Sequence, residues 1–181
     1  MEKFITAARN VGADVQVIEN LEELVAYIDE RIDGSLMMSS CPSLLRADVP
    51  TKLKTAGLDL VDEDFRSRRA AAAAVLTGAN FGIAATGTVV LESTDETVRI
   101  TTTLPEKHFV LLDPRKILST ADEAVPLLND FHQQLPQAYL AYITGPSRTA
   151  DIERVLTIGV HGPAELHILL LEGVSEDLME R

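Results

Sequence analysis

A loop rich in hydrogen-bond donors, at residues 145–163, has the residue types best suited to chemistry. It reads GPSRTADIERVLTIGVHGP and lies between two β-like runs, at residues 138–144 and 166–171. In α/β proteins, ligands collect in crevices beyond the carboxyl ends of strands. We therefore interpret the loop as a candidate site rather than as a linker.

The first residues of this loop predict a tight turn followed by a short helix. Gly145 allows the backbone to turn sharply and to approach a ligand closely, and Pro146 suits the first position of a helix. Three side chains can cap the helix start, those of Ser147, Thr149 and Asp151. These residues are therefore candidate ligand-binding groups.

Arg148 adds a cation to this loop. A guanidinium fixed beside the unpaired N–H groups of a helix start is a good receptor for phosphate or carboxylate. The same residue types also occur in ordinary capped turns, where the arginine is solvated. The spacing alone leaves both interpretations open, an anion site and a capped structural turn.

A second candidate loop is the T-G-T sequence formed by Thr86, Gly87 and Thr88. It places two hydroxyls around a glycine, where a loop enters an expected strand. Such a turn can offer backbone N–H and hydroxyl groups to an anion. A hydrogen-bonded turn without a ligand is the alternative. The sharper hypothesis is that Arg148 and this T-G-T loop together hold one anionic group of a ligand.

Two histidines are candidate general acids or bases, because imidazole titrates near neutral pH. His161 precedes Gly162 on a sharp turn that exposes its ring, and Gly162 is a candidate ligand-binding residue. His108 opens an expected strand, where a hydrogen bond to the backbone is an equally good interpretation. His132 and His167 fall in an expected helix and an expected strand, and we assign them structural roles.

Composition and charge limit the class of protein. A chain of 181 residues with 46% hydrophobic and 24% charged residues fits a single globular domain over residues 1–181. The formal net charge of −12 repels nucleic acid and anionic membrane surfaces, so neither is an expected partner. A small anionic ligand would therefore need a local cluster of donors.

The chain has one cysteine, Cys41. One thiol cannot form an internal disulfide or supply the ligands of an iron–sulfur cluster or a structural zinc site, and no HxH, HxxxH or C-x-x-C spacing is present. We therefore expect that the chain binds no metal or redox cofactor. Residues 1–20 lack the apolar core of a signal peptide, and no run reaches the ~18 apolar residues that span a bilayer. The expected location is the cytoplasm, without membrane insertion.

Hydrophobic periodicity predicts an α/β fold. Expected helices cover residues 1–10, 20–34, 44–56, 65–78 and 122–135, and expected strands cover residues 15–18, 36–40, 58–61, 86–92, 98–104, 109–112, 139–143, 156–159 and 166–171. The β–α–β order over residues 15–40 favours a parallel pair with a right-handed crossover. The closely spaced runs of residues 86–112 favour an antiparallel hairpin or meander. We predict a mixed, mainly parallel sheet flanked by helices, with an antiparallel portion.

Three segments of this sequence resemble the lactate-utilisation protein C family, the LUD domain. They are GPSRTADIE at residues 145–153 followed by GVHGP at residues 159–163, GIAATGTVVL at residues 82–91, and Pro105 with His108. In one position the sequence departs from the pattern: Ala85 stands before T-G-T where many family members carry an acidic residue. We therefore assign no carboxylate chemistry to this loop.

The resemblance implies a fold, a site and a role. The fold would be that of ribose-5-phosphate isomerase, glucosamine-6-phosphate deaminase and CoA transferases, with T-G-T and GPSRTADIE meeting at one cleft. The role would be the oxidation of L-lactate to pyruvate beside iron–sulfur partner proteins, with this chain as an accessory or ligand-binding subunit. Two alternatives stay open: a freestanding enzyme acting on a phosphorylated sugar, nucleotide or acyl-CoA, with His161 or His108 as its acid–base group, and a non-catalytic scaffold.

Overall fold

A six-stranded parallel sheet forms the larger part of the protein. The computed structural model describes residues 1–39, 41–61, 72–135, 137–149, 157–159 and 162–180. In spatial order, the strands are β1 (Asp14–Ile18), β12 (Glu165–Leu171), β7 (Lys107–Leu112), β4 (Ala72–Gly78), β2 (Ser35–Met38) and β3 (Leu60–Val61). Each neighbouring pair is parallel. The predicted β–α–β unit is present in part, because β1 and β2 belong to the same sheet but three other strands separate them.

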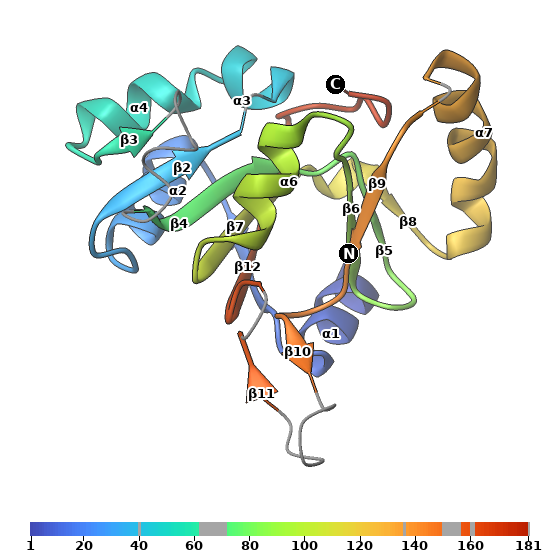
Figure 1. The fold of residues 1–181 in the computed structure, drawn as a ribbon, viewed down its shortest axis with the longest axis horizontal. Helices are drawn as coiled ribbons and strands as arrows, with labels where there is room; N and C mark the ends of the chain where they lie inside the picture. The colour runs from blue at the N-terminus through green and yellow to red at the C-terminus, as the bar shows by residue number, and fades with distance from the viewer. Residues whose placement is uncertain (40, 62–71, 136, 150–156, 160–161, 181) are drawn as a thin grey trace.

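A second, four-stranded sheet lies beside the first (Figure 1). Its order is β8 (Ile117–Leu118), β5 (Phe81–Ile83), β6 (Thr88–Glu92) and β9 (Leu140–Ile143). The β5–β8 pair is parallel, whereas β5–β6 and β6–β9 are antiparallel. A short antiparallel pair, β10 (Arg148–Thr149) with β11 (Thr157–Ile158), extends from the lower end of the molecule in Figure 1. A mainly parallel sheet with an antiparallel portion confirms the predicted fold class.

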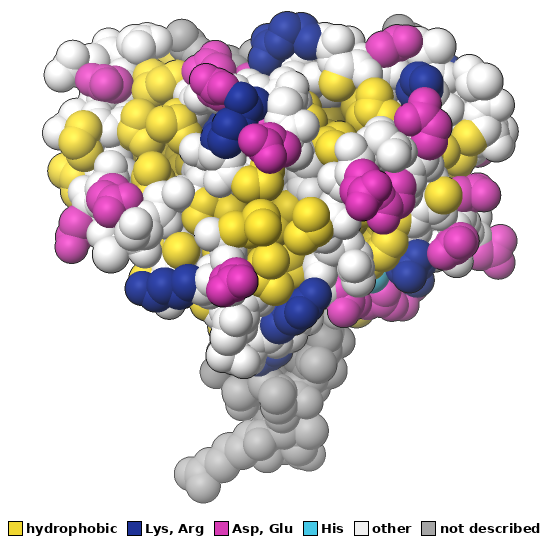
Figure 2. Space-filling model, turned by 180° about the vertical axis from the view of Figure 1, so that it is seen from behind, with side chains coloured by type: hydrophobic (Ala, Val, Ile, Leu, Met, Phe, Trp, Pro, Cys, Tyr) yellow, Lys and Arg dark blue, Asp and Glu magenta, His cyan; other side chains and the backbone are white. Residues whose placement is uncertain are grey.

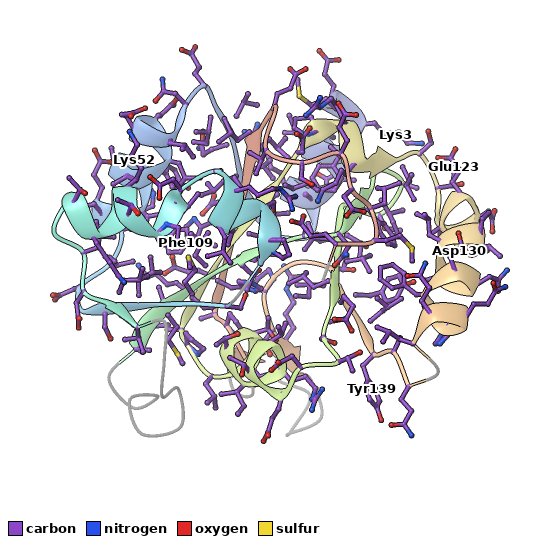
Figure 3. The ribbon with its side chains drawn as sticks, turned by 90° about the horizontal axis from the view of Figure 1, so that it is seen from above. Lys3, Lys52, Phe109, Glu123, Asp130 and Tyr139 are labelled. Carbon is purple, nitrogen blue, oxygen red and sulfur yellow. The ribbon has the colours of Figure 1, made fainter. Side chains whose placement is uncertain are left out.

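Helices connect and cover these sheets. They are α1 (Glu2–Asn10), α2 (Leu21–Asp29), α3 (Pro42–Arg46), α4 (Val49–Thr55), α6 (Glu96–Thr103) and α7 (Val125–Gln134), with 3-10 turns η1 (Pro114–Lys116) and η2 (Ala121–Ala124). The α2 helix is capped by Asn20, whose side chain accepts a hydrogen bond of 2.9 Å from the Glu23 N–H. Figure 3 shows Lys52 on α4 and Asp130 on α7 at opposite sides of the molecule, with Phe109 between them.

The two faces of the parallel sheet are buried by different elements. On one face, α2 and α4 pack through Leu24 and Leu53 against strand residues that include Phe109. On the other face, Phe4 of α1 and Val89 of the second sheet pack against strand residues such as Val110, Ile168 and Leu170. Because both faces are covered, β7 and β12 are almost continuously apolar, as expected for a central parallel strand.

The expected helix over residues 65–78 is wrong where the structure describes it. Residues 72–78 form the strand β4, which pairs with β2 and β7 in the interior of the parallel sheet. Ala74, Val75 and Leu76 are fully buried there. Burial between neighbouring strands therefore outweighs the high helix propensity of alanine, which is worth only up to about 0.7 kcal/mol per residue over ordinary residues.

The expected antiparallel meander over residues 86–112 is also wrong. Strand β6 pairs with β5 and β9, the segment around residues 98–104 is the helix α6, and β7 belongs to the parallel sheet. The N-cap of α6 is Asp95, whose side chain accepts a hydrogen bond of 2.6 Å from the Thr97 N–H. A good N-cap thus starts a helix that the β-branched residues of this segment do not favour on their own.

The described helices are not of the kind that crosses a bilayer, and the surface carries charges of both signs. Within the described ranges, none of the helices has the length and the apolar character needed to cross a membrane. Figure 2 shows acidic side chains scattered singly or in small groups among basic and apolar ones on the face opposite to that of Figure 1. On this face, the net negative charge is therefore spread out.

Candidate functional site

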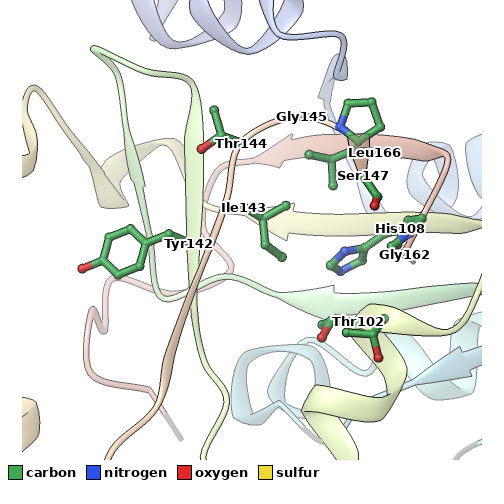
Figure 4. A pocket seen from close by; sticks show the side chains of 12 residues that line it. Thr102, His108, Tyr142, Ile143, Thr144, Gly145, Ser147, Gly162 and Leu166 are labelled. Atoms are coloured by element: carbon green, nitrogen blue, oxygen red, sulfur yellow. The ribbon is translucent and has the colours of Figure 1, made fainter. Parts of the chain in front are cut away.

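A cavity of about 220 Å³ lies where the carboxyl end of β9 meets the amino ends of β7 and β12 (Figure 4). We call it the central pocket. It is lined by Thr102, Thr103, His108, Tyr142, Ile143, Thr144, Gly145, Pro146, Ser147, Gly162, Pro163 and Leu166. The structure thus brings five of the predicted site residues to one place, namely His108, Gly145, Pro146, Ser147 and Gly162. A larger hollow that contains Glu106 adjoins the pocket and shares Thr103 and Gly162 with it.

His108 forms part of the floor of the central pocket. In the register of the parallel sheet, His108 pairs with Leu166 of β12 and with Val75 of β4. The residue is almost fully buried. Its Nε2 lies 2.8 Å from the hydroxyl oxygen of Thr77. Burial lowers the pKa of His108 from 6.5 to about 3. The imidazole is therefore neutral near pH 7 and suits hydrogen bonding better than ion pairing.

Hydroxyl groups form much of the polar lining. Thr102 and Thr103 come from the last turn of α6, where their hydroxyls donate bonds of 2.8 Å to the carbonyls of Val98 and Arg99. Ser147 comes from the loop after β9, and its N–H donates to the carbonyl of Pro163 at 2.9 Å. Sequence reasoning missed the two threonines because it placed them in a strand. An Asp followed by a threonine-rich run was the available signal for a capped helix.

The T-G-T loop reaches the edge of the pocket through hydroxyl contacts. The hydroxyl oxygens of Thr86 and Thr88 are 2.7 Å apart, and that of Thr88 lies 2.8 Å from the hydroxyl of Thr144, which lines the pocket. Gly87 has a φ of +67°, and a Cβ at this position would come within 2.2 Å of the backbone nitrogen of Ala8. The glycine is therefore needed for close packing of this loop on α1.

The start of the 145–163 loop also packs on the end of α1. The Nη2 group of Arg148 donates a hydrogen bond of 2.5 Å to the carbonyl of Val11, and a Cβ on Gly145 would lie 2.3 Å from that same oxygen. The expected helix start at this point is wrong, since Arg148 begins the strand β10 and pairs with Ile158 of β11. Such pairing ties up backbone N–H groups that a helix start would leave free.

Several predicted site residues do not line the pocket or cannot be placed. Arg148, Thr86 and Thr88 each have a hydrogen-bond partner within the chain, so their joint binding of an anion stays a prediction. Asp151 and His161 lie outside the described residues, as does the side chain of Thr149. The acid–base role of His161 therefore stays a prediction as well.

The lining of the central pocket is polar but uncharged. Among the described lining residues there is no Lys, Arg, Asp or Glu. No cluster of three or more His, Cys, Asp or Glu side chains suited to a metal ion occurs in the part of the chain that the structure describes. A pocket of this kind can bind and orient a small polar molecule through hydroxyl groups and one neutral imidazole.

Comparisons with known proteins agree with this architecture. A lactate utilization protein C from Deinococcus radiodurans is 30% identical over 133 residues, covering 71% of this chain and 61% of the relative. Proteins of the same name from Bacillus pumilus and Bacillus mycoides also match. The crystal structure of a DUF162 family protein from Deinococcus radiodurans superposes with a TM-score of 0.65 and 21% identity, covering 94% of both chains. That likeness shows the fold.

Family membership follows from the match to a domain model. The LUD domain model matches residues 1–171, which include both sheets and the central pocket. The chain spans 61%, 47% and 64% of the lengths of the three lactate utilization proteins named above. The chain belongs to the LUD domain family.

Proposed function

We propose that this chain acts in lactate utilisation by binding a small hydroxylated carboxylate, such as L-lactate, in the central pocket. The observation that carries the proposal is the uncharged, hydroxyl-rich lining of that pocket in a chain whose relatives are named lactate utilization protein C. The chain would be a ligand-binding subunit without a redox centre of its own.

The chemistry of the lining supports a hydroxy acid. Hydroxyl groups of Thr144 and Ser147 can donate to a carboxylate, since a hydroxyl rotates to suit its acceptor. The neutral ring of His108 can hydrogen-bond the 2-hydroxyl group without adding a charge. Hydrogen bonds to charged groups are worth roughly 1.5–3 kcal/mol each, so a few of them offset the cost of removing a carboxylate from water.

The same lining weighs against the alternative of an enzyme acting on a phosphorylated sugar, nucleotide or acyl-CoA. Phosphate groups are usually held by Arg, Lys or a bound metal ion. The described lining of the central pocket contains neither Arg nor Lys. The carboxylate of Glu106 in the adjoining hollow repels a phosphate group, with its charge of about −2, more strongly than a singly charged carboxylate. We therefore do not favour a phosphorylated ligand.

Oxidation of lactate to pyruvate removes two electrons and two protons, and the electrons need an acceptor. The single cysteine of this chain cannot supply the thiolates that hold an iron–sulfur cluster. We therefore propose that iron–sulfur partner proteins receive the electrons, while this chain binds and orients the substrate.

Reconstitution of lactate oxidation tests this function. Reduction of an artificial acceptor by L-lactate is measured with the isolated chain, with the iron–sulfur companions alone, and with the mixture. We expect activity only in the mixture. Ser147→Ala should lower this activity, whereas Ser119→Ala, on an exposed loop that does not line the pocket, should not. Full activity of the isolated chain, or of the companions without it, would contradict the proposal.

A further inference from the structure

Residues 173–180, which we call the C-terminal segment, run across the carboxyl edge of the parallel sheet between α3 and α7 (Figure 1). Asp113, directly after β7, accepts hydrogen bonds from the N–H groups of Gly173 at 2.8 Å and Val174 at 3.0 Å. Asn80, just after β4, donates to the carbonyls of Leu178 at 3.2 Å and Glu180 at 2.7 Å. The segment is thus held at both of its ends by residues that follow central strands.

The C-terminal segment places one buried carboxylate, that of Glu180, between the buried Lys116 and the more exposed Arg46. An oxygen of Glu180 lies 3.0 Å from Nη2 of Arg46, and the other lies 3.5 Å from Nζ of Lys116. The side chains of Lys116 and Glu180 are each only 3% exposed. The Oε2 atom of Glu180 has no hydrogen-bond partner in the described structure, so its contact with Lys116 is one of charge alone. Glu180 therefore supplies a counter-charge to Lys116 without forming a hydrogen bond to it.

The cations that contact Glu180 lie within the residues matched by the LUD domain model, whereas Glu180 itself lies outside them. Arg46 at the end of α3, Asn80, and Lys116 in η1 all lie within residues 1–171, which the LUD domain model matches. The segment that carries Glu180 lies beyond that range. A buried lysine requires a counter-charge. In this chain, Lys116 lies within the matched residues, but the counter-charge that it contacts, Glu180, lies outside them.

We propose that Lys116 and Arg46 form a binding site for a small aliphatic carboxylate, and that Glu180 fills this site as an intramolecular competitor. An external carboxylate enters when the C-terminal segment detaches. The location supports a ligand site, because open α/β sheets bind ligands at the carboxyl ends of their strands. The site is separate from the central pocket, which lies at the amino ends of β7 and β12.

The tethered carboxylate explains how such a site could stay hidden. A group linked through a short chain competes at an effective concentration in the millimolar range. Removal of the Glu180 side chain beyond Cβ leaves a space that matches acetate in shape and charge. Acetate is therefore the probe of choice, and acetamide is its uncharged isostere.

Acetate titration of the Glu180→Ala chain tests the proposal. We expect saturable acetate binding at least about tenfold tighter than in the parent, and a rise in the unfolding temperature with acetate. Acetamide should have neither effect. Adding Lys116→Met should abolish the binding, whereas adding Ser147→Ala in the central pocket should leave it intact. If Glu180→Ala binds no acetate, or if Lys116→Met leaves the binding unchanged, the proposal is wrong.

A measurement on the parent chain covers the case in which Glu180→Ala does not fold. Amide hydrogen exchange reports local opening of the C-terminal segment against the rest of the protein. Acetate should accelerate exchange at Val174 and Ser175, whose N–H groups bond to Asp113, and should leave exchange in the central strand β7 unchanged. Exchange in the C-terminal segment that does not respond to acetate would overturn the proposed competition.

Discussion

Burial determines what His108 can do in the central pocket. A histidine at a strand start could be a titrating acid–base group or a structural residue. Its almost complete burial lowers the pKa to about 3, far below the pH of the cell. A base this weak takes up a proton poorly, but a neutral ring in a fixed orientation can position a hydroxyl group. We therefore give His108 a binding role.

The buried histidine makes stability depend on pH. In the unfolded chain the pKa of His108 is 6.5, so below that pH the unfolded state binds a proton that the folded state does not bind until about pH 3. Stability is therefore lost as the pH falls below 6.5, by roughly 1.4 kcal/mol per pH unit. Urea unfolding at about pH 6.5 and about pH 5.5 measures this loss.

Two variants isolate the contribution of His108. In His108→Asn, the fall in unfolding free energy between these two pH values should be smaller than in the parent by about 1 kcal/mol, because half of the unfolded chains already carry the proton at pH 6.5. His132→Asn, at an exposed position on α7, is the control for a histidine-to-asparagine change as such. Equal pH dependence of the parent and His108→Asn would show that the buried imidazole does titrate in the folded protein.

At the scale of elements, local sequence signals predict the correct helix or strand where tertiary packing favours the same secondary structure. Helix α2 lies within the expected helix over residues 20–34, with Asn20 as its N-cap, and β12 covers the apolar run expected as a strand over residues 166–171. The sharp turn expected at Gly145 is also present, since this residue has a φ of +74°, and it lines the central pocket. The likeness of the fold to ribose-5-phosphate isomerase and its relatives stays a prediction.

The wrong assignments have a common cause, which is tertiary context. The alanines of β4 favour a helix, but the strand lies between β2 and β7, where small side chains permit close packing on both faces. The α6 threonines favour a strand, yet in the helix their hydroxyls donate to carbonyls one turn back. Neither sheet pairing nor the approach of α6 to the pocket can be read from local periodicity.

The close contact between the T-G-T loop and α1 predicts a large effect of one methyl group. Gly87→Ala would place a Cβ within 2.2 Å of the Ala8 backbone nitrogen at a φ of +67°. We expect a loss of about 3 kcal/mol or more in unfolding free energy, because positive-φ strain alone costs about 1–3 kcal/mol and the clash adds to it. Chemical denaturation measures the loss.

Gly57 provides the matched control for this substitution. Its φ of +92° is also positive, but a Cβ there would meet no atom within 4 Å. Gly57→Ala should therefore show the backbone strain alone, a loss of about 1–3 kcal/mol. Equal losses of unfolding free energy in Gly87→Ala and Gly57→Ala would show that α1 moves away from the added methyl group at little cost. Close packing against α1 would then not explain the need for Gly87.

At the scale of the whole molecule, the two edges of the parallel sheet differ in charge. The amino edge of β7 and β12 carries the uncharged central pocket, and the carboxyl edge carries Arg46 and Lys116 under the C-terminal segment. A net charge of −12 disfavours anions at long range, so either edge must hold an anion through local donors. Hydroxyl groups serve this purpose at one edge, and the buried Lys116 with the partly exposed Arg46 at the other.

Calorimetric titration of the purified chain with L-lactate tests the binding role of the central pocket most directly. We predict saturable binding that weakens by about ten- to a hundredfold in Ser147→Ala, as expected for the loss of one hydrogen bond to a carboxylate. Ser119→Ala should bind like the parent, and inorganic phosphate should not compete with L-lactate. Absence of L-lactate binding, or equal affinity in Ser147→Ala and the parent, would contradict the proposed role of this pocket.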